Sequence, residues 1–171
     1  MRAHSRLCAT DEDFAKVSLF ILNNKHHLHH SITTVYMITQ LYSYLTDGYL
    51  IQILDADDTV IGATAYYHGT PEQEFENKEI AFVDLAILDP TYRGSRVFVN
   101  GLQYLNNHIR EKHPEVQELH FMALSENSYL CRLYGKFAEV SHSREGVIGI
   151  ESVYCVKVHK LKTSLEKFNK V

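Results

Sequence analysis

The stretch IAFVDLAILDPTYRGSRVFVNGLQYLNNHIREK, residues 80–112, decides the fold of this chain. Its first part, Ile80–Leu88, is almost continuously apolar, which is typical of a strand covered on both faces at the centre of a sheet. Asp89 and Pro90 then interrupt the strand, and Val97–Lys112 has apolar residues at helical spacing. The stretch therefore predicts a central strand, a loop and a helix.

The segments before this stretch predict a strand, two helices and a hairpin. Residues 2–9 suit a short first strand, and the acidic run that begins at Thr10 provides an N-cap for a first helix. Residues 31–45 have apolar side chains at intervals near 3.6 and predict a second helix. Two runs rich in β-branched and aromatic residues, Tyr49–Leu54 and residues 60–67, predict the hairpin.

The segments after it predict three more strands and a short helix. Residues 118–123 suit a strand, residues 127–134 a helix, and residues 137–142 and 150–158 two final strands. Residues 161–171 are basic with few apolar anchors, so we expect a tail that forms at most a fraying helix on the surface.

Length and composition indicate one domain. A chain of 171 residues with 45% hydrophobic content can build a full core, and its three prolines lie between the periodic segments. We therefore expect a single domain over residues 1–160, followed by the basic tail over residues 161–171.

Charge and cysteine content narrow the class of protein. The net charge of −4 and the isoelectric point near 6.2 argue against a surface that binds nucleic acid. No run approaches the roughly 18 apolar residues of a membrane span, and the start of the chain lacks the apolar core of a secretion signal. Cys8, Cys131 and Cys155 fit neither a disulfide framework nor a zinc site. We expect a soluble, cytoplasmic protein with reduced thiols.

The order of these elements resembles the GNAT superfamily of acetyltransferases, and the loop after the central strand supports the resemblance. Residues 90–98 are similar to the family's pyrophosphate loop, Q/R-x-x-G-x-G/A, with Arg93 in the first position and Arg96 and Phe98 in the two small positions. Helix N-termini favour phosphate because their N–H groups and dipole face it. The resemblance implies that the pyrophosphate of coenzyme A is bound by the following residues: Arg93, Gly94, Ser95, Arg96, Val97 and Phe98.

A second motif carries the resemblance further along the chain. Residues 127–137 are similar to the family signature N-x-x-A-x-x-x-Y-x-k-x-G-F, with Asn127 and Tyr134 in place. The resemblance implies that Tyr134 protonates the departing thiolate and that Asn127 contacts the pantetheine arm. It also implies that the arm pairs, like an extra strand, with the backbone of three residues: Ala86, Ile87 and Leu88.

Asp84 is the only charged residue in the central strand, and burying an unpaired carboxylate is costly. One interpretation is that it attracts a cationic amine or accepts its proton, with Phe82 and Ala86 as neighbours on the same strand face. The other is a hydrogen-bonded structural aspartate near a bulge. Both interpretations stay open at this point.

The resemblance implies a single α/β (α+β) domain with a mixed, mostly antiparallel sheet flanked by about four helices. It implies an N-acetyltransferase that uses acetyl-CoA as cosubstrate and needs no metal, with direct attack by a primary amine. The acceptor, a small molecule or a protein, stays unidentified, although Asp84 and the acidic loop over residues 72–79 favour a cation. Dimers are common among proteins of this type, so a homodimer is possible.

Two alternative functions and one further sequence feature accompany this hypothesis. A non-catalytic GNAT-like module that binds an acyl-CoA or another small ligand would explain Arg96 and Phe98 directly. An unrelated α/β domain with a phosphate loop is disfavoured because no G-x-x-x-x-G-K-S/T or G-x-G-x-x-G run is present. Residues 26–30, HHLHH, suggest a metal site, but no Cys, Asp or Glu accompanies them at zinc spacing, so we favour a polar loop near the acceptor entrance.

Overall fold

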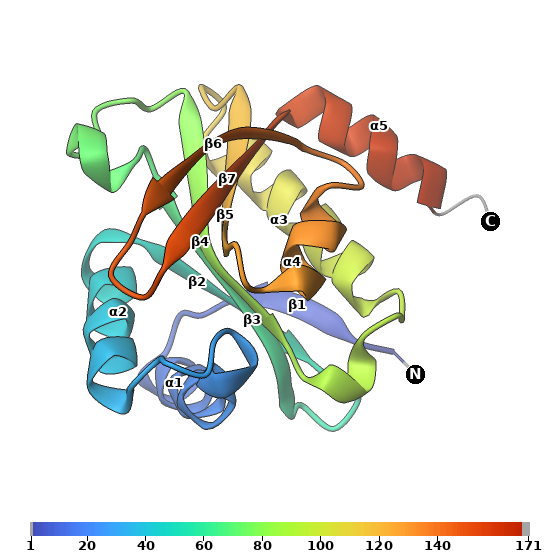
Figure 1. Cartoon of the computed structure of the whole chain (residues 1–171). Helices are drawn as coiled ribbons and strands as arrows, with labels where there is room; N and C mark the ends of the chain where they lie inside the picture. Colours follow the sequence, from blue (N-terminus) through green and yellow to red (C-terminus); the bar gives the residue numbers. More distant parts are fainter. Residues whose placement is uncertain (1, 169–171) are drawn as a thin grey trace.

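The computed structural model describes residues 2–168 and contains one sheet with helices on both faces (Figure 1). The sheet has seven strands: β1 His4–Leu7, β2 Tyr49–Leu54, β3 Val60–His68, β4 Ile80–Leu88, β5 Glu118–Leu124, β6 Glu139–Glu145 and β7 Ile150–Lys157. The described residues form five α-helices: α1 Asp11–Asn24, α2 Thr34–Asp47, α3 Val97–Lys112, α4 Ser128–Tyr134 and α5 Val158–Phe168. None of these helices is both long and apolar enough to cross a membrane.

The sheet is mixed and mostly antiparallel, as expected. Its strand order is β1-β2-β3-β4-β5-β7-β6, and β4 with β5 is the parallel pair among otherwise antiparallel neighbours. A parallel pair needs a crossover connection, which α3 supplies between β4 and β5. The predicted strand–loop–helix unit is therefore the centre of the domain.

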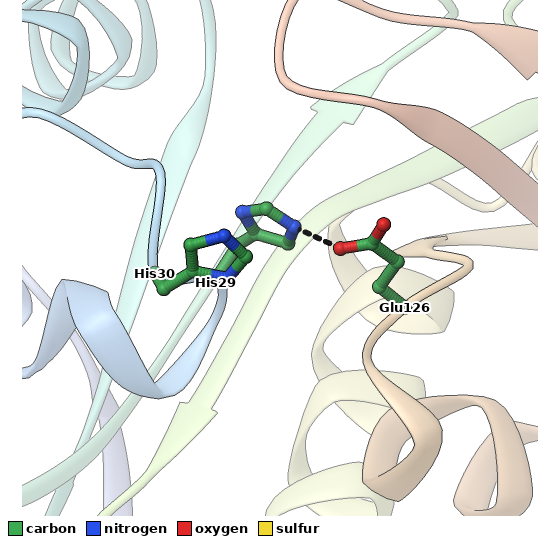
Figure 2. A group of neighbouring side chains, drawn as sticks. All are labelled: His29, His30 and Glu126. Carbon is green, nitrogen blue, oxygen red and sulfur yellow. Dashed lines mark hydrogen bonds and ion pairs between the residues drawn. The ribbon is translucent and has the colours of Figure 1, made fainter.

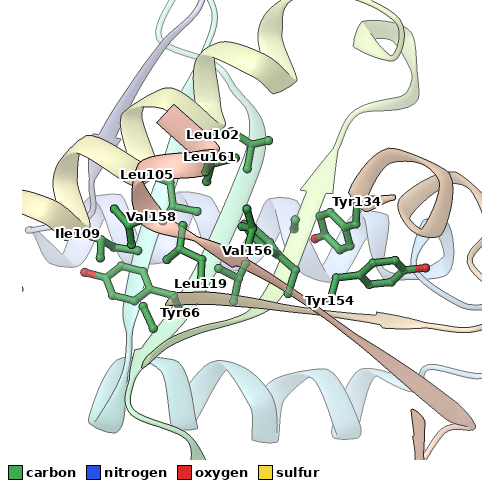
Figure 3. Packing of buried hydrophobic residues seen from close by; sticks show 14 of the residues in the cluster. Tyr66, Leu102, Leu105, Ile109, Leu119, Tyr134, Tyr154, Val156, Val158 and Leu161 are labelled. Carbon is green, nitrogen blue, oxygen red and sulfur yellow. The ribbon is translucent and has the colours of Figure 1, made fainter. Parts of the chain in front are cut away.

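The two faces of the sheet carry separate hydrophobic clusters. One cluster lies under α1 and α2 and includes Val17 and Leu41, which are both buried. The other lies under α3, α4 and α5, where Leu105, Leu119 and Tyr134 pack together (Figure 3). The strands at the middle of the sheet are covered on both sides, which explains why Ile80–Leu88 is almost continuously apolar.

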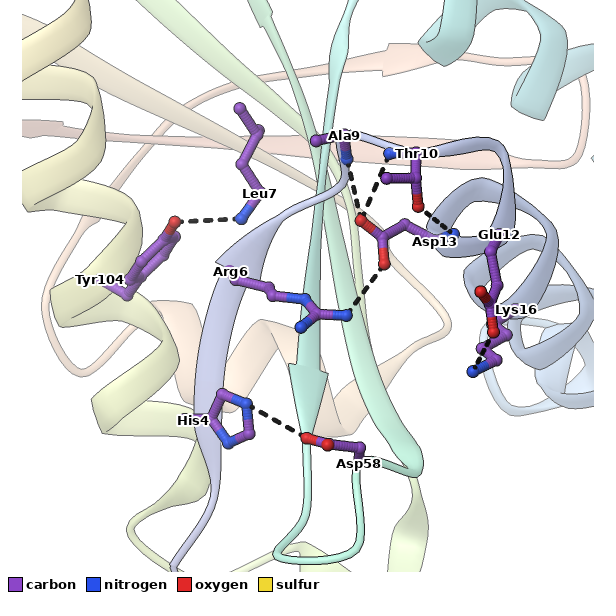
Figure 4. Close-up of polar contacts among 10 residues, drawn as sticks. All are labelled: His4, Arg6, Leu7, Ala9, Thr10, Glu12, Asp13, Lys16, Asp58 and Tyr104. Atoms are coloured by element: carbon purple, nitrogen blue, oxygen red, sulfur yellow. Dashed lines mark hydrogen bonds and ion pairs between the residues drawn. The ribbon is translucent and has the colours of Figure 1, made fainter.

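The predicted cap at the start of α1 is confirmed (Figure 4). The hydroxyl of Thr10 accepts a hydrogen bond from the backbone N–H of Asp13 at 3.1 Å, and the Asp13 carboxylate accepts from the backbone N–H of Thr10 at 3.4 Å. The same carboxylate accepts from Arg6 of β1 at 2.9 Å. The cap therefore also ties α1 to the edge strand.

The expectation of a surface tail after residue 160 is wrong for the residues that the structure describes. Val158, Leu161 and Leu165 are spaced as one face of α5, and all three are buried in the cluster that α3 also covers. Three apolar residues at helical spacing suffice to anchor a short helix, even among many lysines. Residues 169–171 of the expected tail lie outside the described part of the chain.

Leu161 provides a test of this packing. We expect Leu161→Ala to lower the free energy of unfolding by about 2–5 kcal/mol, because it removes a fully buried side chain and leaves a cavity. Urea denaturation followed by circular dichroism measures the change. Lys162→Ala, on the exposed side of the same helix, is the control and should shift the free energy by less than about 0.5 kcal/mol. Equal effects of the two substitutions would contradict the docking of α5.

Candidate active site

The site is built around a gap between two strands of the sheet. Parallel pairing joins β4 to β5 only as far as Val83 and Phe121. Both strands continue, β4 to Leu88 and β5 to Leu124, but the register between them ends there. Residues 86–88 keep their partners on β3, so the edge of β4 that faces β5 lacks a partner strand in the described sheet.

A β-bulge lies at the point where the two strands separate. Leu85 pairs with Ala65 of β3, and Val83 pairs with Tyr66, so Asp84 is an additional residue in β4. A bulge bends the strand and redirects side chains locally, and bulges are frequent next to active sites. The interpretation of Asp84 as a hydrogen-bonded aspartate near a bulge matches its position in the structure.

The bulge changes which side chains share a face with Asp84. Phe82 and Leu85 both belong to the cluster under α1 and α2, whereas Ala86 belongs to the cluster under α3. The expectation that Phe82 and Ala86 flank Asp84 on one face is therefore wrong for Ala86. The strict alternation of a strand, on which that expectation rested, is broken by the additional residue.

Two cavities meet at this gap. We call the first the α3 cavity; its walls include Thr64, Ala86, Ile87, Leu88, Arg93, Phe98, Leu102, Phe121, Asn127 and Tyr129. We call the second the Asp84 cavity; its walls include Tyr36, Met37, Gln40, Tyr44, Asp84, Met122, Leu124, Ile148 and Glu151. Four residues line both cavities: Leu28, Ala86, Asn127 and Leu130. Two ligands bound in these cavities would therefore meet beside the unpaired edge of β4.

The loop that enters α3 combines open space with positive charge. Gly94 has φ +78°, a left-handed value that favours glycine, and an added Cβ would meet no atom within 4 Å. Arg93 is exposed, with its guanidinium carbon 4.2 Å from the centroid of the Tyr129 ring. Arg96 is also exposed. The first N–H groups of any α-helix lack intrahelical partners, so the start of α3 suits an anion.

Ser95 and Phe98 lie at the entry to α3, Ser95 exposed and Phe98 partly buried. The hydroxyl of Ser95 accepts a hydrogen bond from the backbone N–H of Val97 at 3.3 Å, at the first residue of α3. Phe98 is partly buried, packs against the hydrophobic clusters and lines the α3 cavity. Its ring therefore narrows the cavity, while the loop around Gly94 stays open.

Asp84 is held by α2 in an acidic environment. The hydroxyl of Tyr44 donates a hydrogen bond to the Asp84 carboxylate at 2.6 Å. The pKa of Asp84 is raised from 3.8 to about 6, because burial and the charges of Glu151 and Glu72 raise it more than the bond from Tyr44 and the charge of Arg144 lower it. Arg144 is paired with Glu151 at 2.9 Å and also with Glu72, so one guanidinium faces three carboxylates in this region. The excess of negative charge favours a cationic ligand.

Tyr134 lies behind the cavities rather than in their walls. Its side chain is 0% exposed, and its hydroxyl has no hydrogen-bond partner among the described residues. The ring lies 5.0 Å from that of Phe121, which does line the α3 cavity. Burial raises the pKa of the Tyr134 hydroxyl above its ordinary value, so the group keeps its proton at neutral pH. In this structure the Tyr134 ring packs on the sheet, as it would if its role were structural.

Asn127 fixes the junction between the cavities. It is the N-cap of α4, since its Oδ1 accepts a hydrogen bond from the backbone N–H of Leu130 at 3.1 Å. Its Nδ2 donates to the backbone carbonyl of Leu28 at 3.3 Å. Asn127 therefore joins the start of α4 to the segment between α1 and α2, in addition to lining both cavities.

The histidine-rich segment faces an acidic residue that sequence spacing did not reveal (Figure 2). His29 Nε2 lies 2.5 Å from the Glu126 carboxylate, across a sequence separation of 97 residues. His29 Nδ1 accepts from the backbone N–H of Ser31, so its proton is on Nε2 and is donated to Glu126. Both ring nitrogens of His29 thus have protein partners. His27 and Leu28 of this segment line the α3 cavity, so the segment borders the site.

The raised pKa of Asp84 predicts how stability depends on pH. The folded-state pKa of about 6 exceeds the ordinary value of 3.8, so the fold favours the protonated carboxyl. The free energy of unfolding therefore falls as the pH rises from the ordinary pKa of Asp84 to its folded-state pKa. Asp84→Asn should therefore raise that free energy by roughly 1–3 kcal/mol at pH 8, and by much less below pH 4. Urea denaturation at a series of pH values measures it. Glu145→Gln, an exposed carboxylate at the end of β6, is the control, and a pH-independent effect of Asp84→Asn would contradict the prediction.

No protein-family model and no curated protein matches the sequence. Solved structures do match the fold. A protein from Desulfovibrio desulfuricans assigned to the GNAT family of acetyltransferases has a TM-score of 0.70 at 12% identity, over 92% of this chain and 99% of that one. The ribosomal-protein-S5-alanine acetyltransferase from Vibrio fischeri has a TM-score of 0.65 at 13% identity, over 92% and 93% of the two chains. An N-acetyltransferase from Staphylococcus aureus has a TM-score of 0.65 at 15% identity, over 92% and 99%. The chain thus adopts the fold of the GNAT acetyltransferases.

Proposed function

We propose that this protein is a GNAT-family N-acetyltransferase that transfers an acetyl group from acetyl-CoA to a primary amine. The observation that carries the proposal is the gap between β4 and β5, where the α3 cavity and the acidic Asp84 cavity share walls. One cavity is suited to an acyl donor with phosphates, and the other is suited to a cation. A transfer reaction needs two such ligands in contact.

The residues around the α3 cavity fit coenzyme A. The unpaired edge of β4 at Ala86, Ile87 and Leu88 offers backbone groups to an extended arm with amide groups. Residues 93–98 offer the open space at Gly94, two exposed arginines and the start of α3 to a diphosphate. Phe98 contributes its ring to the apolar wall, and its backbone N–H lies in the first turn of α3. Bound acetyl-CoA supplies the acetyl group as a thioester.

The Asp84 cavity supports an amine acceptor. The excess of carboxylates draws in an ammonium group, and Asp84, with a pKa raised to about 6, accepts a proton more readily than an ordinary aspartate. Tyr44 holds the carboxylate in one orientation through its 2.6 Å hydrogen bond. An ammonium group has no free electron pair, so its proton first passes to Asp84, directly or through water. The free amine then attacks the thioester carbonyl, the C–S bond breaks, coenzyme A leaves as the thiolate, and the nitrogen loses its remaining extra proton to solvent. The acceptor is a small molecule or a protein amine, and the similar structure from Vibrio fischeri is a ribosomal-protein-S5-alanine acetyltransferase.

Tyr134 is the proposed proton donor for the thiolate. Its buried hydroxyl has no partner among the described residues and keeps its proton, and an orphaned buried hydroxyl is costly unless a ligand satisfies it. The ring contacts Phe121 in the wall of the α3 cavity. Because Tyr134 lines neither cavity, the proposed role requires that binding of the coenzyme move the Phe121 wall so that the hydroxyl faces the sulfur.

A second candidate function is a non-catalytic module that binds an acyl-CoA or another small ligand. Two observations favour it: Phe98 narrows the α3 cavity, and Tyr134 lines neither cavity. Coenzyme binding without turnover would identify such a module.

Calorimetric titration with acetyl-CoA and with coenzyme A tests the coenzyme site. We expect binding in the micromolar range, about −8 kcal/mol. Arg93→Ala and Arg96→Ala should each weaken it by roughly 10- to 100-fold, because each removes a charge-assisted contact to phosphate. Arg110→Ala, near the other end of α3, is the control and should leave affinity unchanged. Unchanged affinity in the two loop variants would contradict the pyrophosphate loop, and no binding by the unmodified protein would contradict the coenzyme site.

Substitution of Tyr134 tests the proton donor, with release of coenzyme A from acetyl-CoA as the assay over a panel of amines. We expect Tyr134→Phe to lower kcat by roughly 10²- to 10⁴-fold at neutral pH. Its free energy of unfolding should not fall, because the lost hydroxyl makes no hydrogen bond in the described structure. Tyr154→Phe is the matched control, since its ring lies 5.8 Å from that of Tyr134. A Tyr134→Phe variant with unchanged kcat would remove the proton-donor role.

A further inference from the structure

Helix α2 has a second apolar face that the domain does not cover. Its inner face buries Met37, Leu41 and Tyr44 against the sheet. The outer face exposes four large apolar side chains with these exposed fractions: Val35 74%, Ile38 52%, Tyr42 68% and Leu45 45%. Soluble proteins rarely leave such a contiguous row in water without a partner.

The spacing of these four residues indicates the kind of partner. They recur at intervals of three, four and three residues, which is the a/d pattern of two consecutive heptads. A row of this kind packs against another helix with a matching row. We call it the α2 seam: Val35, Ile38, Tyr42 and Leu45.

The charges around the seam argue against two other occupants, a membrane surface and a charged helix. Asp47, the last residue of α2, is the only charged residue in the helix, and the positions beside the seam are Thr34, Thr39 and Thr46. A helix that binds a membrane surface carries Lys or Arg on its polar face, and this one carries none. A charged partner helix would find no complementary charge. A second copy of α2 meets both conditions, because it is equally apolar and brings no charge into the interface.

We propose that the α2 seam is the contact surface of a homodimer, in which α2 packs antiparallel against α2 of a second copy around a two-fold axis. In that arrangement Val35 faces the partner subunit's Leu45, and Ile38 faces the partner subunit's Tyr42. The contact is self-complementary and closed, so it stops at two copies.

The dimer would also brace the candidate active site. The same helix sends Tyr36, Gln40 and Tyr44 into the Asp84 cavity, and Tyr44 holds the Asp84 carboxylate. Contact with a second copy on the outer face of α2 would restrict movement of the helix, and with it the wall of the Asp84 cavity that α2 forms. The inference concerns the surface of α2 and stands independently of the proposed transfer reaction.

The mass in solution tests the proposal. Sedimentation velocity and light scattering over a concentration series should show a dimer for the unmodified protein. Ile38→Glu and Tyr42→Glu should each raise the dimer dissociation constant at least ~100-fold, because each places two carboxylates in an apolar contact. Val147→Glu is the matched control: the residue is 85% exposed, lies between β6 and β7 outside the seam, and should leave the dimer intact.

Two results would overturn the proposal. One is a monomer for the unmodified protein at about 100 μM, a concentration far above a micromolar dissociation constant. The other is a dimer that Ile38→Glu and Tyr42→Glu weaken no more than Val147→Glu does. Circular dichroism checks that the variants are folded, and if a glutamate variant is not, the double variant Ile38→Ala with Tyr42→Ala replaces it, with at least a 10-fold weaker dimer expected.

Discussion

The end of pairing between β4 and β5 is the constraint on which the rest of the site depends. A strand buried on both faces must satisfy its backbone groups, and β4 does so on one edge only after Val83. The bulge at Asp84 bends the strand at the same place, and α3 begins beyond its end. The two cavities share the wall at Ala86 on this edge; Arg93 of the loop lines one of them, and Asp84 with Glu151 lines the other.

Local elements of this fold could be predicted because their signals are local. Ile80–Leu88 and Val97–Lys112 have the boundaries expected from the apolar run and from the helical spacing. The cap of α1 was likewise recognisable from Thr10 and its acidic neighbours. The packing of α5 on the core was missed because lysines dominate its composition. Leu161 and Leu165 find their partners on elements far away in the chain.

The chemistry of the site was less predictable, since it depends on contacts between distant segments. The two motifs identified Arg93 and Asn127, and its charge within an apolar strand singled out Asp84. The structure brings all three to the walls of the joined cavities. Tyr44 and Glu126, by contrast, had no signal: their partners are 40 and 97 residues away. A strand period of two also cannot anticipate a bulge, which is why Ala86 lies on the face opposite to the one expected.

The position of α5 has a consequence for how the chain is made. Because α5 follows all seven strands in the sequence, it leaves the ribosome after every one of them. Until then the flank of the cluster that Leu161 and Leu165 fill lacks these two side chains. The apolar cluster under α3 and α4 is therefore closed only when the last helix docks, and before that step it exposes apolar surface of the kind that chaperones bind.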